Sequence, residues 1–140
     1  MKKRIVDYIK VVVFAFWGVL FLAMTGCGSM EDLKLRDLEF TVLGEEKIPA
    51  QLAPMIAEKK ETSFQFTYSD NEYLYICVGY GIQESGGYSI AVNELYLTED
   101  NIHVDTNLLG PESKEKSNKV PSYPYIVIKT EHLDKTVIFE

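Results

Sequence analysis

The stretch "EYLYICVGY", Glu72–Tyr80, decides the fold because both of its alternating sets of side chains are apolar. Successive side chains of a strand point to opposite faces. A strand without a polar face is covered on both sides, so we expect this one at the centre of a sheet. Cys77 is predicted to be a small buried residue rather than a reactive thiol, because no cation or histidine flanks it.

The sequence before this strand predicts a strand, a helix and a second strand. "DLEFTVLG", 37–44, alternates as a first strand. The segment 45–61 then predicts a short helix, with Leu52, Met55 and Ile56 on its covered face. "SFQFTYS" follows the helix, alternates again and places its three aromatic residues on one face.

A glycine-rich stretch, "GYGIQESGGYSIAV" at Gly79–Val92, follows the central strand. Gly86 and Gly87 can adopt positive φ, so the stretch predicts a tight hairpin link into the next strand. The alternation of that strand slips by one residue at Asn93 and Glu94, which predicts a β-bulge.

The remaining sequence predicts three more strands and one long loop. "IHVDTNLL", 102–109, has a polar face that includes His103, and we expect that face to be solvated. The polar segment 110–124 is long for a connection in a small domain. "YIVIKTEHL", 125–133, and "KTVIFE", 135–140, predict a closing hairpin.

Together these patterns predict a mainly β domain over 37–140. We expect a small, antiparallel β-sandwich or open barrel of about seven strands with one short helix. The domain is large enough for one hydrophobic core.

The first residues predict a lipoprotein signal peptide over 1–26. A basic start precedes an apolar run and small residues, as in secretory signals. "MTGC", Met24–Cys27, resembles the bacterial lipobox, which implies a diacylglyceryl lipid with palmitate-type acyl chains on Cys27. Residues 27–36 would then be a lipidated tether that anchors the domain at the extracytoplasmic face of the cell membrane. The alternative is an uncleaved membrane helix, which also leaves the domain outside the cytoplasm.

Charge and cysteine content limit the partners and the covalent structure. The chain has a formal net charge of −7, and without residues 1–26 ten basic and twenty acidic residues remain. Such a domain repels nucleic acid, so no nucleic-acid partner is expected. A lipidated Cys27 would leave Cys77 without a disulfide partner, so the domain depends on its core.

The sequence predicts no catalytic set, no metal site and no cofactor. His103 and His132 are the only two histidines, and no serine lies in a nucleophile-elbow motif. Two isolated histidines and one free cysteine do not have zinc-ligand spacing. The glycine-rich stretch has no lysine and no following helix, so it does not predict a phosphate loop. We therefore expect a protein that is not an enzyme.

The order of motifs in the second half resembles the PrcB C-terminal domain family, over roughly residues 45–140. The features that carry the resemblance are Gly79, "SGGYSI" at 85–90, Pro111 and "YPYIVIK" at 123–129. This family takes its name from a lipoprotein subunit of a bacterial surface protease complex. The resemblance implies a non-catalytic accessory domain that supports or stabilises a protease or another envelope complex.

The resemblance and the loop positions define a set of candidate partner contacts. These are Ser85, Gly86, Gly87, Tyr88, Tyr123, Pro124 and Tyr125. The partner would be an envelope or secreted protein, such as a protease. Two alternatives remain open: an Ig-like peptidase inhibitor that presents the Gly86-Gly87-Tyr88 turn, and a small ligand-binding or hydrolytic domain. The same glycines and Tyr88 could also serve only the fold, with the tyrosine ring in the core.

Overall fold

The computed structural model describes residues 32–113 and 118–140. The predicted signal peptide, Cys27 and residues 27–31 of the tether lie outside the described residues. Within the described part of the chain, no helix is both long and apolar enough to cross a membrane.

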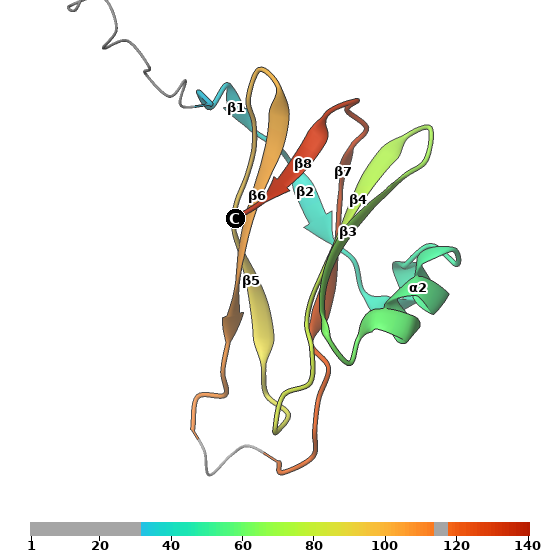
Figure 1. Ribbon diagram of the computed structural model, residues 1–140, viewed down its shortest axis with the longest axis vertical. Helices are drawn as coiled ribbons and strands as arrows, with labels where there is room; N and C mark the ends of the chain where they lie inside the picture. The colour runs from blue at the N-terminus through green and yellow to red at the C-terminus, as the bar shows by residue number, and fades with distance from the viewer. Residues whose placement is uncertain (1–31, 114–117) are drawn as a thin grey trace, which may run out of the picture. The chain divides into compact units, whose positions relative to one another are not determined.

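The described residues form two four-stranded sheets and one short α-helix, with no closed barrel (Figure 1). Sheet 1 has the order β1 (Arg36–Asp37), β5 (Ser89–Leu97), β6 (Asn101–Leu109) and β8 (Thr136–Phe139). Sheet 2 has the order β2 (Phe40–Val42), β7 (Tyr125–Glu131), β4 (Tyr73–Tyr80) and β3 (Ser63–Ser69). A 3-10 helix, η1 (Glu45–Lys47), precedes α2 (Leu52–Lys59). The mainly β prediction is confirmed.

Two hydrophobic clusters cover the two faces of sheet 2. The core between the sheets is built from aliphatic residues of both: Leu38, Leu74, Ile76, Val78, Leu95, Leu97, Ile102, Val104 and Ile128. On the outer face of sheet 2, α2 places Leu52 and Ile56 against Phe64, Cys77 and Val127. Strand β4 is therefore buried on both faces, as its sequence predicts.

The helix meets the sheet along one line of residues only. Leu52 and Ile56 are four positions apart and are both buried. Met55 was expected beside them, but 37% of its surface is exposed. An eight-residue helix that contacts a sheet through one i, i+4 line leaves its neighbouring positions in solvent.

The predicted bulge is present in β5. The pairing of β5 with β6 shifts register between Val92 and Glu94. The side-chain amide of Asn93 donates a hydrogen bond of 2.9 Å to Asp105 Oδ2 across the strands. The bulge returns the apolar side chains of β5 to the core side, as the slip in alternation indicated.

The predicted single strand at 37–44 is wrong, because the segment divides between the two sheets. Residues of β1 pair with β5 in sheet 1, and those of β2 pair with β7 in sheet 2. Leu38 lies between them, is buried in the inter-sheet core and donates its N–H to Leu95 O at 2.9 Å. We call residues 36–42 the crossing segment.

The predicted closing hairpin is also wrong. Strand β7 already pairs with β4 on one edge and with β2 on the other, so it has no free edge for a partner. The chain instead crosses through residues 132–135, where Leu133 packs on the inter-sheet core. Strand β8 then pairs in parallel with β6.

The glycine-rich link is a crossover between sheets rather than a tight hairpin. Strand β4 belongs to sheet 2 and β5 to sheet 1, so the two are not paired. Positive φ occurs at Gly81 (71°) and Gly87 (86°), and not at Gly86. The chain needs these turns because only eight residues, 81–88, connect a strand of one sheet to a strand of the other.

Candidate functional site

Two loops meet at the end of the domain away from the β5–β6 hairpin turn. One joins β4 to β5 and contains Gly81–Tyr88, and the other joins β6 to β7 and contains residues 118–124. Figure 1 shows both at the same end of the ribbon. We call this surface the loop end. It brings together most of the candidate contacts predicted from two separate parts of the sequence.

Hydrogen bonds hold the two loops together. The N–H of Gly86 donates to Asn118 Oδ1 at 2.8 Å, and Ser122 Oγ donates to Ser85 O at 2.6 Å. Gln83 and Ser122 exchange backbone hydrogen bonds of 2.8 and 3.1 Å as an isolated bridge. Backbone groups fixed in this way lose little further entropy on binding, so the loop end is preorganised.

Gly87 and Tyr88 pack against the start of the second loop. A Cβ added to Gly87 would lie 3.0 Å from the Pro111 Cβ, and φ at Gly87 is positive. A Cβ added to Gly110 would lie 3.7 Å from the Tyr88 ring. Tyr88 is half-buried, so its ring is neither a core residue nor a fully displayed one.

Tyr123, Pro124 and Tyr125 lie in the second loop and at its junction with β7. The Pro124 carbonyl accepts the Tyr80 N–H at 3.1 Å. The Tyr123 ring lies under Lys60 Nζ, 5.2 Å from the ring centre. Tyr125 packs with the cluster under α2, and burial, together with the charge of Glu45, raises the pKa of its hydroxyl. Tyr125 therefore faces the helix side rather than the paired loops.

Two exposed apolar residues of the loop end were missed from the sequence. Ile82 is 56% exposed and Val120 is 63% exposed. The available signal was a single apolar residue in each of two otherwise polar stretches, "GIQES" and "SNKVPS". Each is a single exposed apolar side chain, and a protein that covered the loop end would bury both.

A second group of aromatic residues lies on the outer face of sheet 2, beside the helix. Tyr75 packs against Tyr68 and Tyr73, with ring centres 6.1 and 6.5 Å apart. Lys129 Nζ lies 3.7 Å from the centre of the Tyr73 ring. Tyr75 donates its hydroxyl to Asp70 Oδ2 at 3.2 Å, and burial raises the pKa of Tyr75.

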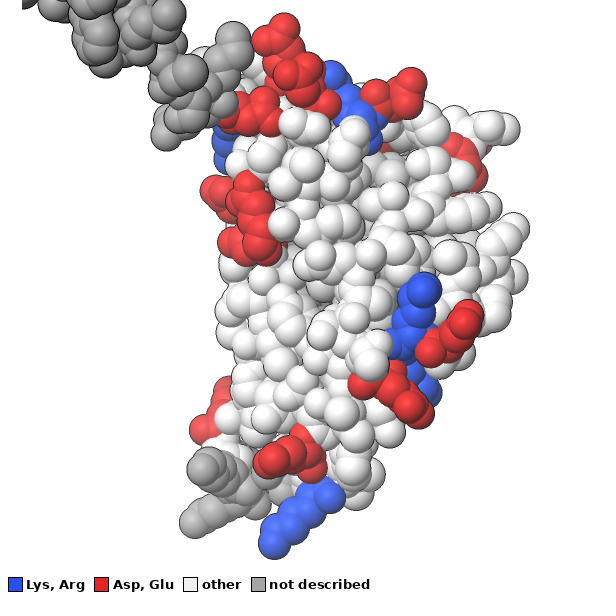
Figure 2. Space-filling view, viewed as in Figure 1, with Lys and Arg blue, Asp and Glu red and all other residues white. Residues whose placement is uncertain are grey.

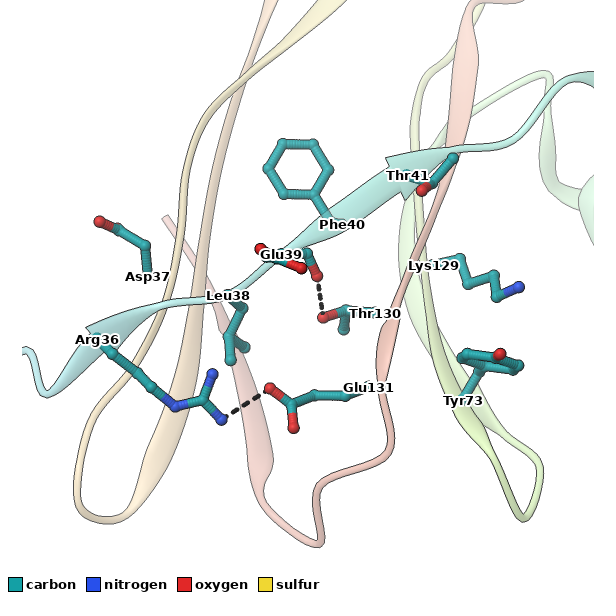
Figure 3. Close-up of a pocket in the computed structure, with 10 residues that line it drawn as sticks. All are labelled: Arg36, Asp37, Leu38, Glu39, Phe40, Thr41, Tyr73, Lys129, Thr130 and Glu131. Carbon is teal, nitrogen blue, oxygen red and sulfur yellow. Dashed lines mark hydrogen bonds and ion pairs between the residues drawn. The ribbon is translucent and has the colours of Figure 1, made fainter.

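A groove of about 900 Å³ lies beside the crossing segment. Figure 3 shows the residues that line it. Arg36 Nη2 and Glu131 Oε1 form an ion pair of 2.7 Å across it. Thr130 Oγ1 donates to the Glu39 carbonyl at 2.8 Å. The guanidinium and the Glu131 carboxylate neutralise each other, and Asp37, Glu39 and Lys129 also line the groove.

The prediction of a solvated His103 is wrong. Only 9% of its surface is exposed, and its ring stacks on Tyr96 with centres 4.9 Å apart. Nε2 lies 3.0 Å from Asp32 Oδ2, and Nδ1 lies 2.6 Å from Glu140 Oε1. Burial alone lowers the pKa of His103, but hydrogen bonds to the two carboxylates outweigh it and raise the pKa above its usual value.

The surroundings of Cys77 and His103 constrain both side chains. Burial raises the pKa of Cys77 to about 12, so its thiol stays protonated at neutral pH. Both His103 nitrogens are occupied by carboxylates on an otherwise covered ring. In residues 32–113 and 118–140, no group of three or more histidine, cysteine, aspartate or glutamate side chains is placed to hold a metal ion.

Acidic side chains dominate the charged surface on the face seen in Figure 2. They lie around the edges of that face, and a broad central area carries no Lys, Arg, Asp or Glu. The charge distribution fits the formal net charge of −7. A surface of this kind favours neutral or basic protein partners over polyanions.

Residues 74–131 match the family model described as PrcB C-terminal. The match begins in β4 and ends at the last residue of β7, so it includes both loops of the loop end. No curated protein and no solved structure matches the chain. The resemblance expected from the order of sequence motifs is thereby confirmed over residues 74–131, a shorter range than the expected 45–140.

Proposed function

On the premise that residues 74–131 form a PrcB C-terminal domain, we propose that this chain is a non-catalytic accessory domain that binds another protein. The partner is an envelope or secreted protein, such as a protease, and binding supports or stabilises its complex. The observation that carries this proposal is the loop end, where two hydrogen-bonded loops display Ile82 and Val120.

A rigid surface with exposed apolar residues suits binding better than chemistry. The loops are preorganised by hydrogen bonds through Ser122 and Asn118, which lowers the entropy lost on association. Tyr88 and Tyr123 border the same loops and add large side chains of the type enriched in interfaces. Burial keeps Cys77 protonated, so the one described thiol supports no nucleophilic alternative.

The proposal places the domain at the extracytoplasmic face of the cell membrane through a lipid on Cys27. The support is the lipobox-like "MTGC" after an apolar run with a basic start. Metabolic labelling with an alkyne-palmitate should mark the wild-type chain and not a Cys27→Ala variant. Equal labelling of both chains would refute the anchor and leave the protein-binding proposal intact.

The protein-binding proposal is tested by crosslinking the full chain in intact cells and recovering it from solubilised membranes. Ile82→Ser and Val120→Ser should each reduce recovery of the same specific partner about tenfold, as expected when an exposed apolar contact is lost from an interface. Leu35→Ser is the matched control, because Leu35 is also 63% exposed and its N–H bonds to Leu97 O at the other end of the domain.

Two outcomes would contradict the proposal. Unchanged partner recovery by both loop-end variants would mean that the loop end is not the binding surface. Stoichiometric slowing of an extracellular protease by the purified chain, lost in a Tyr88→Ala variant, would instead support the peptidase-inhibitor alternative. A denaturant titration of each variant shows whether its fold is retained.

A further inference from the structure

We propose that an extended segment of a partner protein adds to sheet 1 along β5, at Ser89–Asn93. We call Ser89–Asn93 the open edge. The inference rests on the proposed function only in requiring that the domain has a protein partner. It concerns a different surface and a different kind of contact, in which backbone hydrogen bonds provide much of the affinity.

Strand β1 covers only one end of β5. Its two residues pair with Leu97 and Tyr96, and the next contact is the hydrogen bond from Leu38 N to Leu95 O. Among the described strands, none pairs with Ser89–Asn93 on that side. Figure 1 shows β1 beside the hairpin-turn end of β5 and β6, whereas β5 begins toward the opposite end.

The edge is open because the chain leaves sheet 1 at Leu38. Strand β1 runs antiparallel to β5, so its straight continuation would have passed alongside the open edge. The crossing segment turns into sheet 2 instead and forms β2 against β7. The segment after Leu38 therefore leaves the position beside the open edge without a strand.

Two apolar side chains of β2 point from sheet 2 toward sheet 1. Phe40 and Val42 pair with Thr130 and Ile128, so they lie on the inter-sheet face of sheet 2. They are nevertheless 41% and 46% exposed. Figure 3 shows the Phe40 ring pointing away from Lys129, which lies on the outer face.

The β5 residues beyond the end of β1 are less buried than those that lie beside β1. Leu95 and Leu97 are 3% and 9% exposed under the β1 contacts. Val92 packs against the same core, Ile90 lies two positions before it on the same side of the strand, and both are only half-buried. A strand laid along the open edge would cover these residues and Phe40 together, which removes apolar surface from water.

The open edge has the length and composition of a pairing site. Five residues of strand span about 16 Å, which is close to a typical strand length. Exposed edges are usually protected by lysine, proline or inward charges. Ser89–Asn93 contains no charged residue and no proline, and only the bulge at its end interrupts the ladder.

The charges around the edge indicate what the added segment contains. Asp37, Glu39 and Glu94 are exposed near it, and Lys34 Nζ lies 2.6 Å from Asp37 Oδ1 and 3.9 Å from Glu94 Oε1. A second copy of this acidic chain would be repelled. The occupant that fits is a segment of another protein in which apolar residues alternate with neutral or basic ones.

The test uses the full chain extracted from membranes in detergent and a synthetic octapeptide that alternates Lys or Thr with Val or Ile. Saturating peptide should slow amide hydrogen exchange in Ser89–Asn93 about tenfold or more, because new ladder hydrogen bonds protect the edge. The same peptide with N-methyl groups on the amides that face β5 should give no protection. Protection confined to the edge strand β3, Ser63–Ser69, would overturn the proposal.

Matched variants test the side-chain part of the same site. Phe40→Lys should weaken peptide binding about tenfold, since it places a charge under the added strand. Thr41→Lys should have no effect, because Thr41 lies on the opposite face of the same short strand. Equal effects of the two variants, or equal binding of the N-methylated peptide, would refute strand addition.

Two further results separate this inference from the proposed function. Partner recovery that depends on Ile82 and Val120, without peptide protection of the open edge, would refute strand addition and leave the proposed function standing. Peptide protection of the edge, with partner recovery that is unchanged in Ile82→Ser and Val120→Ser, would refute the loop end as the binding surface and leave strand addition standing. Exchange protection that rises with the chain's own concentration would identify a second copy as the occupant and overturn the partner named here.

Discussion

Replacing Gly79 with alanine should destabilise the domain strongly, although Gly79 lies in a regular strand. An added Cβ would lie 2.2, 2.6 and 2.7 Å from three atoms of the Phe64 ring, whereas ordinary contacts are 3.4–4 Å. Phe64 is directly opposite in β3 and is only 8% exposed under α2. The ring cannot keep its place above an alanine.

The expected loss in the free energy of unfolding depends on how far the Phe64 ring is displaced. Overpacking that shifts backbone or side chains costs about 1–3 kcal/mol. Full loss of a buried phenylalanine costs about 3–5 kcal/mol, which sets the upper limit. Replacing a strand glycine by alanine returns about 0.5–1 kcal/mol of chain entropy. We expect a net loss of about 2–3 kcal/mol in the free energy of unfolding.

A double-mutant cycle in denaturant isolates the cause. In a Phe64→Ala background, Gly79→Ala should be neutral or slightly stabilising, which gives a coupling energy of about 2–3 kcal/mol between the two positions. Gly44→Ala is the control, because its Cβ would meet only the flexible carboxylate of Glu46. A cost of Gly79→Ala that is the same with and without the Phe64 ring would refute the reasoning.

Three further predictions follow from the loop end, the core thiol and the buried histidine. Gly87→Ala should cost about 1–2 kcal/mol of unfolding free energy, because φ is 86° there. Cys77 should resist iodoacetamide at pH 8 in the folded chain, since burial raises its pKa to about 12. A wild-type chain should lose stability relative to His103→Gln as the pH rises from about 6.5 through the raised histidine pKa, because the charged ring and its two carboxylates are stabilising only below that pKa.

Each of these has a control and a contradicting outcome. Gly86→Ala should cost less than Gly87→Ala, because φ at Gly86 is not positive and only the Asn118 side chain must move. Labelling of Cys77 in the folded chain, located by peptide mass, as fast as in urea would contradict its burial. A flat stability difference between wild type and His103→Gln across that pH range would contradict the charged pairing.

The sequence predicted the features that depend only on the side chains of the element itself, namely the burial of β4 and the bulge in β5. The doubly apolar "EYLYICVGY" places β4 under α2 on one face and under sheet 1 on the other. The slip at Asn93 and Glu94 marks a bulge for the same reason, because alternation must stay in phase with the core.

Strand partners could not be predicted, because they depend on which edges other strands already occupy. The segments 125–133 and 135–140 look like a hairpin by composition, yet β7 has no free edge for β8. The segment 37–44 alternates like one strand, and nothing in its residues marks the switch of sheets at Leu38.

The candidate site was predicted in part. Glycines and prolines located both loops, because turns need their backbone conformations. The contacts between the loops, such as Gly86 with Asn118, join residues 32 positions apart and leave no local pattern. The burial of His103 was not predicted for the same reason, since its partners Asp32 and Glu140 are 71 and 37 positions away in the sequence.

The crossing segment also determines how the domain would respond to tension. A pull on the chain before Asp32 is transmitted first to the contacts of Asp32 with Asn101 and His103, and then to β1. Two residue pairs hold β1 to β5, whereas seven hold β4 to β7. The load would peel β1 from β5 and draw Leu38 out between the sheets before the larger ladders yield. Moderate force would thus leave Tyr96 and Leu97 of β5 without a partner strand on that side, while the rest of the domain stays folded.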